Sequence, residues 1–180
     1  MIVMKVMVLS GSSRPNSNTR GLAKEVCVHL EQQKVDVLFF DVGINELPIY
    51  KGGEDMEHPE VKRLQRYAEE ADAFFVCTPE YHSGMSGALK NALDFLHGDH
   101  FRGKPVMIAA VGGGGKGGIN ALNNLRTVLR GVYALVLSDQ YVTDMSCYND
   151  RCELVHDDSR TRLKEMVCEL LRVTKALKQS

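Results

Sequence analysis

The 180-residue sequence lacks several features that mark particular classes of protein. Its 22 basic and 23 acidic residues are interspersed and give a net charge of −1, so nothing indicates a nucleic acid or a charged membrane surface as a partner. No apolar run approaches the roughly 20 residues of a membrane span, and the N-terminal apolar stretch lacks the basic region and cleavage site of a signal peptide. We therefore expect a cytoplasmic protein.

The five cysteines include no Cys-x-x-Cys pair, which fits reduced thiols in the cytoplasm. Cys27, Cys77 and Cys168 fall within apolar periodic segments, so we expect them in the core. Cys147 and Cys152 flank a turn, and the sequence assigns no chemistry to them. No cluster of histidine and carboxylate side chains has the spacing of a known metal motif, and we expect no metal site.

The sequence does contain five short apolar runs that alternate with amphipathic helical segments. The strand-like runs are residues 2–9, 35–42, 73–78, 105–111 and 132–142, and five helices are expected between and after them. This alternation predicts a parallel sheet with helices on both faces, because right-handed crossovers connect parallel strands. The length suits one domain with a full core, which we expect to comprise residues 1–180.

The segment LSGSSRPNSNTRGLA, residues 9–23, ends the first strand and leads into the first helix. A helix N-terminus presents unpaired N–H groups and a partial positive charge, both of which favour an anion. Eight polar residues in ten exceed what one helix cap requires, although a cap with surface hydroxyl groups is the alternative. The segment is neither GxGxxG nor a Walker A loop, and it suits a terminal phosphate better than a bridging pyrophosphate.

Two further loops follow predicted strands. TPEYHSG, residues 78–84, offers an aromatic side chain and backbone N–H groups to a flavin ring, but it fits an ordinary strand–helix connection equally well. GGGGKGG, residues 112–118, has backbone without side chains that a flat group can approach closely; a flexible loop without contacts is the alternative. His82 could serve as a general acid, but flavin hydride chemistry needs none, which favours a positioning role.

Ligands of open parallel sheets bind beyond the carboxyl ends of the strands, where the strand order reverses. The two loops with the most possible ligand contacts follow the first and third strands. This favours the order 2-1-3-4-5, partly by analogy with flavodoxin, which binds FMN between those strands. We therefore expect a flavodoxin-like α/β three-layer sandwich with a five-stranded parallel sheet and helices on both faces.

With these loops in view, the chain resembles the NADPH-dependent FMN reductase family of flavodoxin-like proteins, most closely its azobenzene, chromate and quinone reductase branch. The matching segments are GSSRPNSNTR, LPIY after the second strand, and TPEYHSGMSGALKNALDF, which is close to the family signature PEY-[NH]-x-S-x-x-G-x-LKNA-D. The resemblance spans the whole chain in order. It implies an oxidoreductase in which hydride passes from NADPH, or NADH, through non-covalent FMN to a quinone, azo compound, chromate or free flavin. A ping-pong reaction is expected from the loops, because those after the first, third and fourth strands would leave one open flavin face that both substrates share.

The resemblance also implies which residues contact the cofactor. It assigns phosphate binding to Ser10, Ser12, Arg14, Ser17, Asn18 and Thr19. It places the isoalloxazine ring against Pro79, Glu80, Tyr81, His82, Ser83 and Gly84, with Gly112, Gly113, Gly114 and Gly115 nearby. The reaction then belongs to the cofactor, and no side chain is expected to be catalytic.

Family members are dimers or tetramers, and the third predicted helix gives an independent reason to expect a homodimer or a dimer of dimers. Its apolar positions span more of the helix than one sheet face can cover, namely Ala88, Leu89, Ala92, Leu93, Phe95 and Leu96. For the nucleotide, Arg14 and Lys116 lie on loops beside the expected ring site. Either cation could pair with a 2′-phosphate and favour NADPH over NADH.

Two other functions fit the same fold. One is a flavodoxin-like electron carrier without pyridine-nucleotide activity, although such carriers tend to be strongly acidic and this chain is nearly neutral. The other is a non-catalytic flavin-binding or regulatory module. The purified protein's colour separates these functions, because a regulatory module would be colourless and only the enzyme would bleach when NADPH is added.

Overall fold

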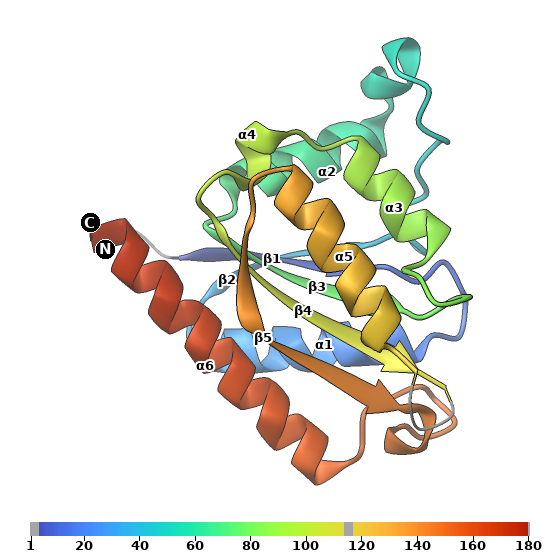
Figure 1. Ribbon diagram of the computed structural model, residues 1–180, viewed down its shortest axis with the longest axis vertical. Helices are drawn as coiled ribbons and strands as arrows, with labels where there is room; N and C mark the ends of the chain where they lie inside the picture. The colour runs from blue at the N-terminus through green and yellow to red at the C-terminus, as the bar shows by residue number, and fades with distance from the viewer. Residues whose placement is uncertain (1–3, 114–116, 180) are drawn as a thin grey trace.

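The computed structural model describes residues 4–113 and 117–179 (Figure 1). Within these ranges five strands form one parallel sheet in the order β2-β1-β3-β4-β5, as the sequence predicts. The strands are β1 (Lys5–Ser10), β2 (Asp36–Asp41), β3 (Ala73–Pro79), β4 (Pro105–Gly112) and β5 (Leu135–Asp144). The helices are α1 (Asn18–Gln32), α2 (Pro59–Glu70), α3 (Gly87–Asp94), α4 (Gly98–Phe101), α5 (Ile119–Gly131) and α6 (Asp157–Gln179), with 3₁₀ turns η1 (Gly53–Glu57) and η2 (Met145–Cys147).

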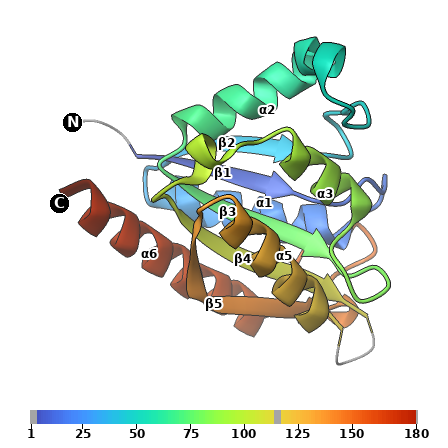
Figure 2. The ribbon, with the colours of Figure 1, turned by 45° about the horizontal axis from the view of Figure 1, so that its top comes forward.

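Helices cover the sheet on both faces (Figure 2). Helices α2, α3 and α5 pack on one face, where their apolar side chains join Met7 and Leu9 of β1. Helices α1 and α6 pack on the other face, against Val6 and Val8. The side chains of β1 alternate between the two clusters because successive residues of a strand point to opposite faces. The predicted three-layer sandwich is therefore confirmed.

The strand order reverses at β1, which places a crevice at the carboxyl end of the sheet. At this end Ser10 of β1 pairs with Asp41 of β2 on one side and with Cys77 of β3 on the other. The chain leaves β1 toward α1 on one face and leaves β3 toward α3 on the opposite face. Because the two connections diverge, their loops leave space between them, which is where ligands of such sheets bind.

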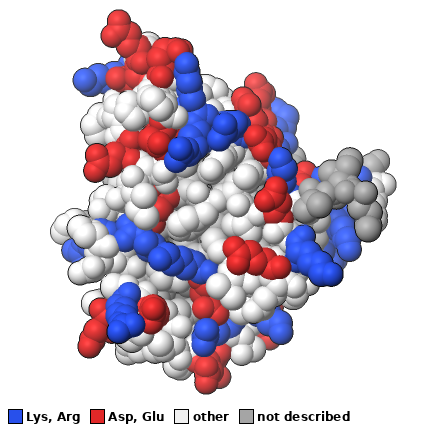
Figure 3. Space-filling model, turned by 180° about the vertical axis from the view of Figure 1, so that it is seen from behind, with Lys and Arg blue, Asp and Glu red and all other residues white. Residues whose placement is uncertain are grey.

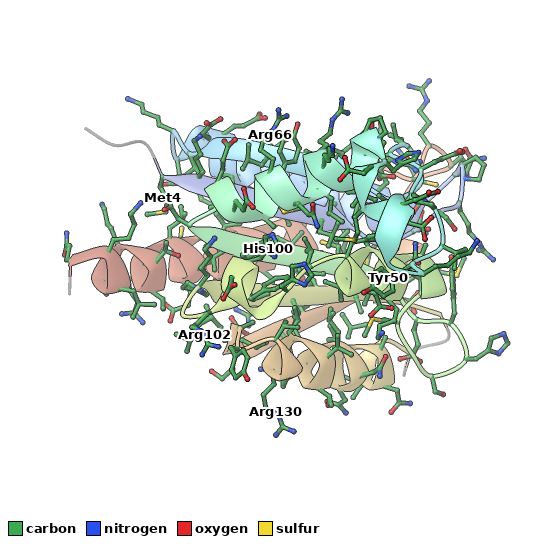
Figure 4. All side chains as sticks on the ribbon, turned by 90° about the horizontal axis from the view of Figure 1, so that it is seen from above. Met4, Tyr50, Arg66, His100, Arg102 and Arg130 are labelled. Carbon is green, nitrogen blue, oxygen red and sulfur yellow. The ribbon has the colours of Figure 1, made fainter. Side chains whose placement is uncertain are left out.

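The segment predicted as one third helix is divided in the structure. Helix α3 ends at Asp94, and the short helix α4 begins only at Gly98. Phe95 and Leu96 are nevertheless buried, and the ring of Phe95 contacts Tyr50 edge-on at 5.1 Å between ring centroids (Tyr50 is labelled in Figure 4). Of the apolar stripe, only Ala88 is partly exposed. The expectation that this helix needs a partner subunit to cover it is therefore wrong, because the chain covers the stripe itself.

Several predicted boundaries shift by a few residues. Residues 2 and 3 of the first predicted strand lie outside the described residues. The second helix begins at Pro59, after η1, and β5 begins at Leu135 because Val132 still caps α5. Residues 143–157, which follow the last predicted strand, are partly ordered by the end of β5, by η2 and by an antiparallel bridge between Tyr148 and Leu154. These differences leave the sheet order unchanged.

Two surface properties bear on function. Among the helices of residues 4–113 and 117–179, none is long and apolar enough to cross a membrane. On the face shown in Figure 3, basic and acidic side chains are interspersed. The face shown therefore mixes the two signs of charge.

Candidate functional site

The loops after β1, β3 and β4 and the segment after β5 surround a cleft of about 580 Å³ at the carboxyl end of the sheet. Its size is in the range of small-molecule and cofactor sites. The cleft is lined by Ser12, Arg14, Asn16, Ser17, Asn18, Thr19, Pro79, Glu80, Tyr81, Val111, Gly112, Gly113, Met145, Tyr148, Asn149, Asp150 and Cys152. It thus brings together residues from all three loops that the sequence singles out.

The expected site residues do not all lie in this cleft. Ser10 lies beneath it, fully buried at the end of β1. His82, Ser83 and Gly84 are not part of its lining. Gly114, Gly115 and also Lys116, the expected partner of a 2′-phosphate, lie outside the described residues.

The N-terminus of α1 forms one end of the cleft. Ser17 is its N-cap, and the Ser17 hydroxyl accepts a hydrogen bond from the amide of Arg20 at 3.2 Å. Among the described residues, no acceptor bonds to the amides of Asn18 and Thr19, as expected for the first positions of a helix. These donors and the helix dipole make this end of the cleft suited to an anion.

Two buried hydroxyl groups lie close to this helix terminus in the chain. The Ser12 hydroxyl accepts a long hydrogen bond, 3.4 Å, from the amide of Arg14. The Ser10 hydroxyl is fully buried and has no hydrogen-bond partner among the described residues. Buried hydroxyl groups are normally paired, because an unpaired one costs about 1–3 kcal/mol. The unpaired Ser10 hydroxyl therefore fits a site whose ligand supplies the missing partner.

A buried ion pair supports the loop between β1 and α1. The guanidinium group of Arg20 donates to both carboxylate oxygens of Asp41, at 2.8 and 3.0 Å, and Asp41 is only 1% exposed. The hydrogen bonds with Asp41 raise the pKa of Arg20 above its usual value. Neither residue was expected at the site from the sequence. The sequence signal for this pair was Asp41 itself, because a carboxylate at the end of a buried strand usually needs a partner of opposite charge.

The loop after β3 ends in a tight turn. Tyr81 and Gly84 exchange two backbone hydrogen bonds of 2.9 and 3.0 Å, and both central residues have positive φ, 48° at His82 and 62° at Ser83. His82 and Ser83 at the tip are exposed and do not line the cleft. The guanidinium carbon of Arg14 lies 5.4 Å from the centroid of the Tyr81 ring, so this turn contacts the loop after β1.

The Glu80 side chain bonds to the N-terminus of α5, whereas the sequence led us to expect a contact with a ligand. One of its carboxylate oxygens accepts a hydrogen bond of 3.0 Å from the amide of Ala121, in the first turn of α5. The preceding N-cap residue is Gly118, which has no side chain to perform this function. Glu80 therefore caps α5 from a distance, and its own amide is fixed by the carbonyl of Val111 at 3.1 Å.

Glycines allow close backbone approach at the end of β4. A Cβ atom added to Gly112 would overlap the backbone of Gly117, and one added to Gly117 would lie 2.7 Å from the carbonyl oxygen of Gly113. These two positions therefore need glycine for internal packing. Among the described residues, a Cβ at Gly113 would meet the sulfur of Met145, at 3.7 Å, and no other atom within 4 Å. The wall at Gly113 is thus flat backbone facing Met145.

The far wall of the cleft comes from the segment after β5, which was not expected to take part. It includes Met145, Tyr148 and Cys152. The Tyr148 hydroxyl lies 2.7 Å from that of Thr143, and burial raises the pKa of Tyr148 well above its usual value. The phenol therefore stays neutral. Burial also raises the pKa of Cys27, to about 12, and of the buried Cys77, so these thiols are not nucleophiles.

The cleft thus has an anion-binding end at α1 and a flat, partly aromatic end between Tyr81, Gly113 and Tyr148. An FMN molecule has a terminal phosphate at one end and a planar ring at the other. The unpaired Ser10 hydroxyl, the free amides of α1 and the side-chain-free wall at Gly113 fit the two ends of that cofactor.

Comparisons with known proteins agree with this site. Residues 4–146 match the family model described as NADPH-dependent FMN reductase. An NADPH azoreductase of Bacillus sp. (strain OY1-2) is 44% identical over 161 residues, which cover 86% of this chain and 88% of that protein. An FMN-dependent NADPH-azoreductase of Staphylococcus aureus (strain USA300) is 31% identical over 173 residues, 89% of each chain.

A solved structure shows the same fold. The flavoenzyme NAD(P)H:(acceptor) oxidoreductase FerB of Paracoccus denitrificans superposes with a TM-score of 0.78 at 25% identity, covering 97% of this chain and 98% of FerB. An NADH:FMN oxidoreductase, EMOB, in its apo form has the same TM-score at 23% identity and supports the fold alone. The family model covers most of the chain, and both azoreductases match nearly end to end. The chain therefore belongs to the NADPH-dependent FMN reductase family.

Proposed function

We propose that this protein is an FMN-dependent NADPH oxidoreductase of the azoreductase type. The observation that carries the proposal is the two-ended cleft, with unpaired amides of α1 at one end and a flat backbone wall at the other. Membership of the family supports FMN as the cofactor and NADPH as the electron donor. When bound, FMN supplies the chemistry, because its ring takes up hydride and passes the electrons on.

We assign the residues of the chain to binding and positioning. Ser12, Ser17 and the amides of Asn18 and Thr19 would hold the phosphate, with Ser10 beneath them. Tyr81, Gly113 and Tyr148 would border the ring. The amides of His82 and Ser83 have no acceptor among the described residues and could serve the polar edge of the ring. We propose no catalytic side chain, since the structure gives Glu80 a helix to cap and leaves His82 exposed outside the cleft.

We propose that the donor and a small acceptor use the cleft in turn. Quinones, azo compounds, chromate and free flavin are the acceptor classes that the resemblance suggests. The loops after β1, β3 and β4 form the walls, so both substrates would enter by the same open side, and the oxidised nucleotide would leave before the acceptor enters. Arg14 lines the cleft and is the described cation placed to favour NADPH over NADH.

Initial-rate kinetics test this order of events. With NADPH varied at several fixed quinone concentrations, we expect parallel double-reciprocal lines, because no complex contains both substrates. Intersecting lines would indicate a ternary complex and contradict the shared open side.

In the Arg14→Ala variant, the preference for NADPH over NADH in kcat/KM should fall, and an unchanged ratio would remove Arg14 from nucleotide recognition.

Other aspects of the proposal rest on separate observations. All five cysteines are free, which supports a reducing compartment, and we propose the cytoplasm. We propose a homo-oligomer, either a dimer or a dimer of dimers, because the apolar Ile49 and Tyr50 are 70% and 42% exposed beside α3. We also propose that residues 1–180 form one domain.

An electron carrier is less well supported, since Figure 3 shows no acidic docking surface on the face it displays.

A further inference from the structure

Arg20 contacts the backbone of the loop that precedes it. Its Nη1 atom donates to the carbonyl oxygen of Pro15 at 2.6 Å, and Nη2 donates to that of Arg14 at 3.3 Å. The same guanidinium group binds both oxygens of Asp41 through Nε and Nη2. Arg20 therefore joins two consecutive carbonyls of the loop to the end of β2, and only 14% of its side chain is exposed.

The geometry on the other side of the pair is equally constrained. One carboxylate oxygen of Asp41 also accepts a hydrogen bond of 2.8 Å from the amide of Gly43, which fixes the carboxylate. A Cβ atom at Gly43 would lie 2.6 Å from Nη2 of Arg20 and 2.8 Å from the carbonyl oxygen of Ser12. Only glycine leaves room there for the guanidinium group and the loop together.

This arrangement determines where the amide of Asn16 points. The described peptide bonds include no cis bond, and in a trans peptide the N–H points opposite to the C=O. Since the carbonyl of Pro15 faces Arg20, the amide N–H of Asn16 faces away from Arg20, and Asn16 lines the cleft. If the two carbonyls were free, they could turn toward the cleft, where their oxygens would repel a phosphate.

We propose that Arg20 is a positioning residue that fixes the loop 14–17 so that the amide N–H of Asn16, and neither of the two carbonyls, faces the FMN phosphate, and that it thereby sets the preference for phosphate-bearing flavins. The inference rests on the proposed function. Arg20 acts here through geometry rather than charge, because Asp41 neutralises it and a prearranged donor needs no ordering when the ligand binds.

Two variants test the proposal without leaving a buried charge unpaired. The double variant Arg20→Gln/Asp41→Asn removes both charges together, which avoids the large cost of breaking a buried ion pair from one side. Arg20→Lys keeps the charge but loses the planar fork that reaches Asp41 and the two carbonyls at once. Lys24→Gln is the matched control, since it removes a positive charge one turn further along α1 from a side chain without these contacts.

The measurement is the Kd of FMN and of riboflavin for the full-length protein freed of flavin, by fluorescence quenching. We expect both test variants to bind FMN about tenfold or more weakly, with riboflavin changed less than about twofold, as for the loss of one charge-assisted hydrogen bond to phosphate. The control should leave both affinities unchanged. A purely structural role would lower the affinities for both flavins together. An equal loss of affinity for the two flavins, no loss of affinity for either, or failure of both variants to fold would each overturn the proposal.

The same experiment separates this inference from the function on which it rests. If the unaltered protein binds neither flavin, the proposed function fails whatever Arg20 does. If it binds FMN more tightly than riboflavin and the variants keep the same ratio of affinities, the function stands and Arg20 has no positioning role.

Discussion

FMN is expected to bind at least about 100-fold more tightly than riboflavin, which lacks only the phosphate. The end of the cleft at α1 offers unpaired amides and the Ser12 and Ser17 hydroxyls. A hydrogen bond to a charged group contributes about 1.5–3 kcal/mol, so two such bonds to phosphate already correspond to about 100-fold. Titration of the flavin-free protein with each compound, followed by fluorescence quenching, gives the ratio directly.

The Ser17→Ala variant is a second test of the phosphate assignment. The side chain caps α1, and loss of a cap costs about 1 kcal/mol of stability, which a thermal melt would show as a small shift. Its FMN affinity should fall while its riboflavin affinity stays nearly constant. Equal affinities of the unaltered protein for FMN and riboflavin would contradict the assignment of the loop 10–19 to a phosphate.

Gly21→Ala is expected to destabilise the protein by about 2 kcal/mol, although alanine is the better helix former. Gly21 lies in the second turn of α1, where a Cβ atom would overlap the carbonyl oxygen of Cys152 and lie 3.0 Å from its carbonyl carbon. The obstacle is backbone, and Cys152 already has a positive φ of 58°. Overpacking of this kind costs about 1–3 kcal/mol and outweighs the helix propensity gained.

Gly87→Ala is the matched control for this substitution. Gly87 is also helical, in the first turn of α3, but a Cβ atom there would meet no atom of residues 4–113 or 117–179 within 4 Å. Its stability should be unchanged or slightly raised, because alanine loses less backbone entropy on folding. Denaturant unfolding of the two variants compares them directly. A Gly21→Ala protein as stable as the Gly87→Ala protein would mean that the segment around Cys152 moves freely away from α1.

The sheet order, and the cleft that the loops after β1 and β3 border, could be predicted because both depend on local patterns. Five apolar runs with helices between them leave few compact arrangements, and the polar loops after β1 and β3 indicate which strands are central. The anion-binding end at Ser17 follows from the composition of one segment. The signature TPEYHSGMSGALKNALDF added the family, which matches the comparisons.

The features that could not be predicted depend on contacts between distant segments. Glu80 looks like a ligand contact in the sequence, but its partner is an amide of α5, 41 residues away. The Arg20–Asp41 pair spans 21 residues and becomes visible only when β2 lies beside β1. Likewise, nothing local indicates that Cys152 packs on Gly21 and lines the cleft.

The break between α3 and α4 also depends on a contact between distant segments. Periodicity predicts one apolar stripe through Leu96, and the side chains are indeed buried. The helix nevertheless ends at Asp94, and the ring of Phe95 packs against Tyr50. Burial of an apolar residue can thus be predicted from its pattern, whereas the element that covers it cannot.

The most direct test of the account is an anaerobic titration of the purified, flavin-loaded protein with NADPH, followed by visible absorbance. The account predicts that the yellow absorbance of FMN is lost with about one equivalent of NADPH, because one hydride carries both electrons, and that it returns when a quinone is added. Absorbance that NADPH leaves unchanged, but that a chemical reductant such as dithionite removes, would contradict the account, because it indicates a flavoprotein without NADPH activity, either an electron carrier or a non-catalytic flavin-binding module.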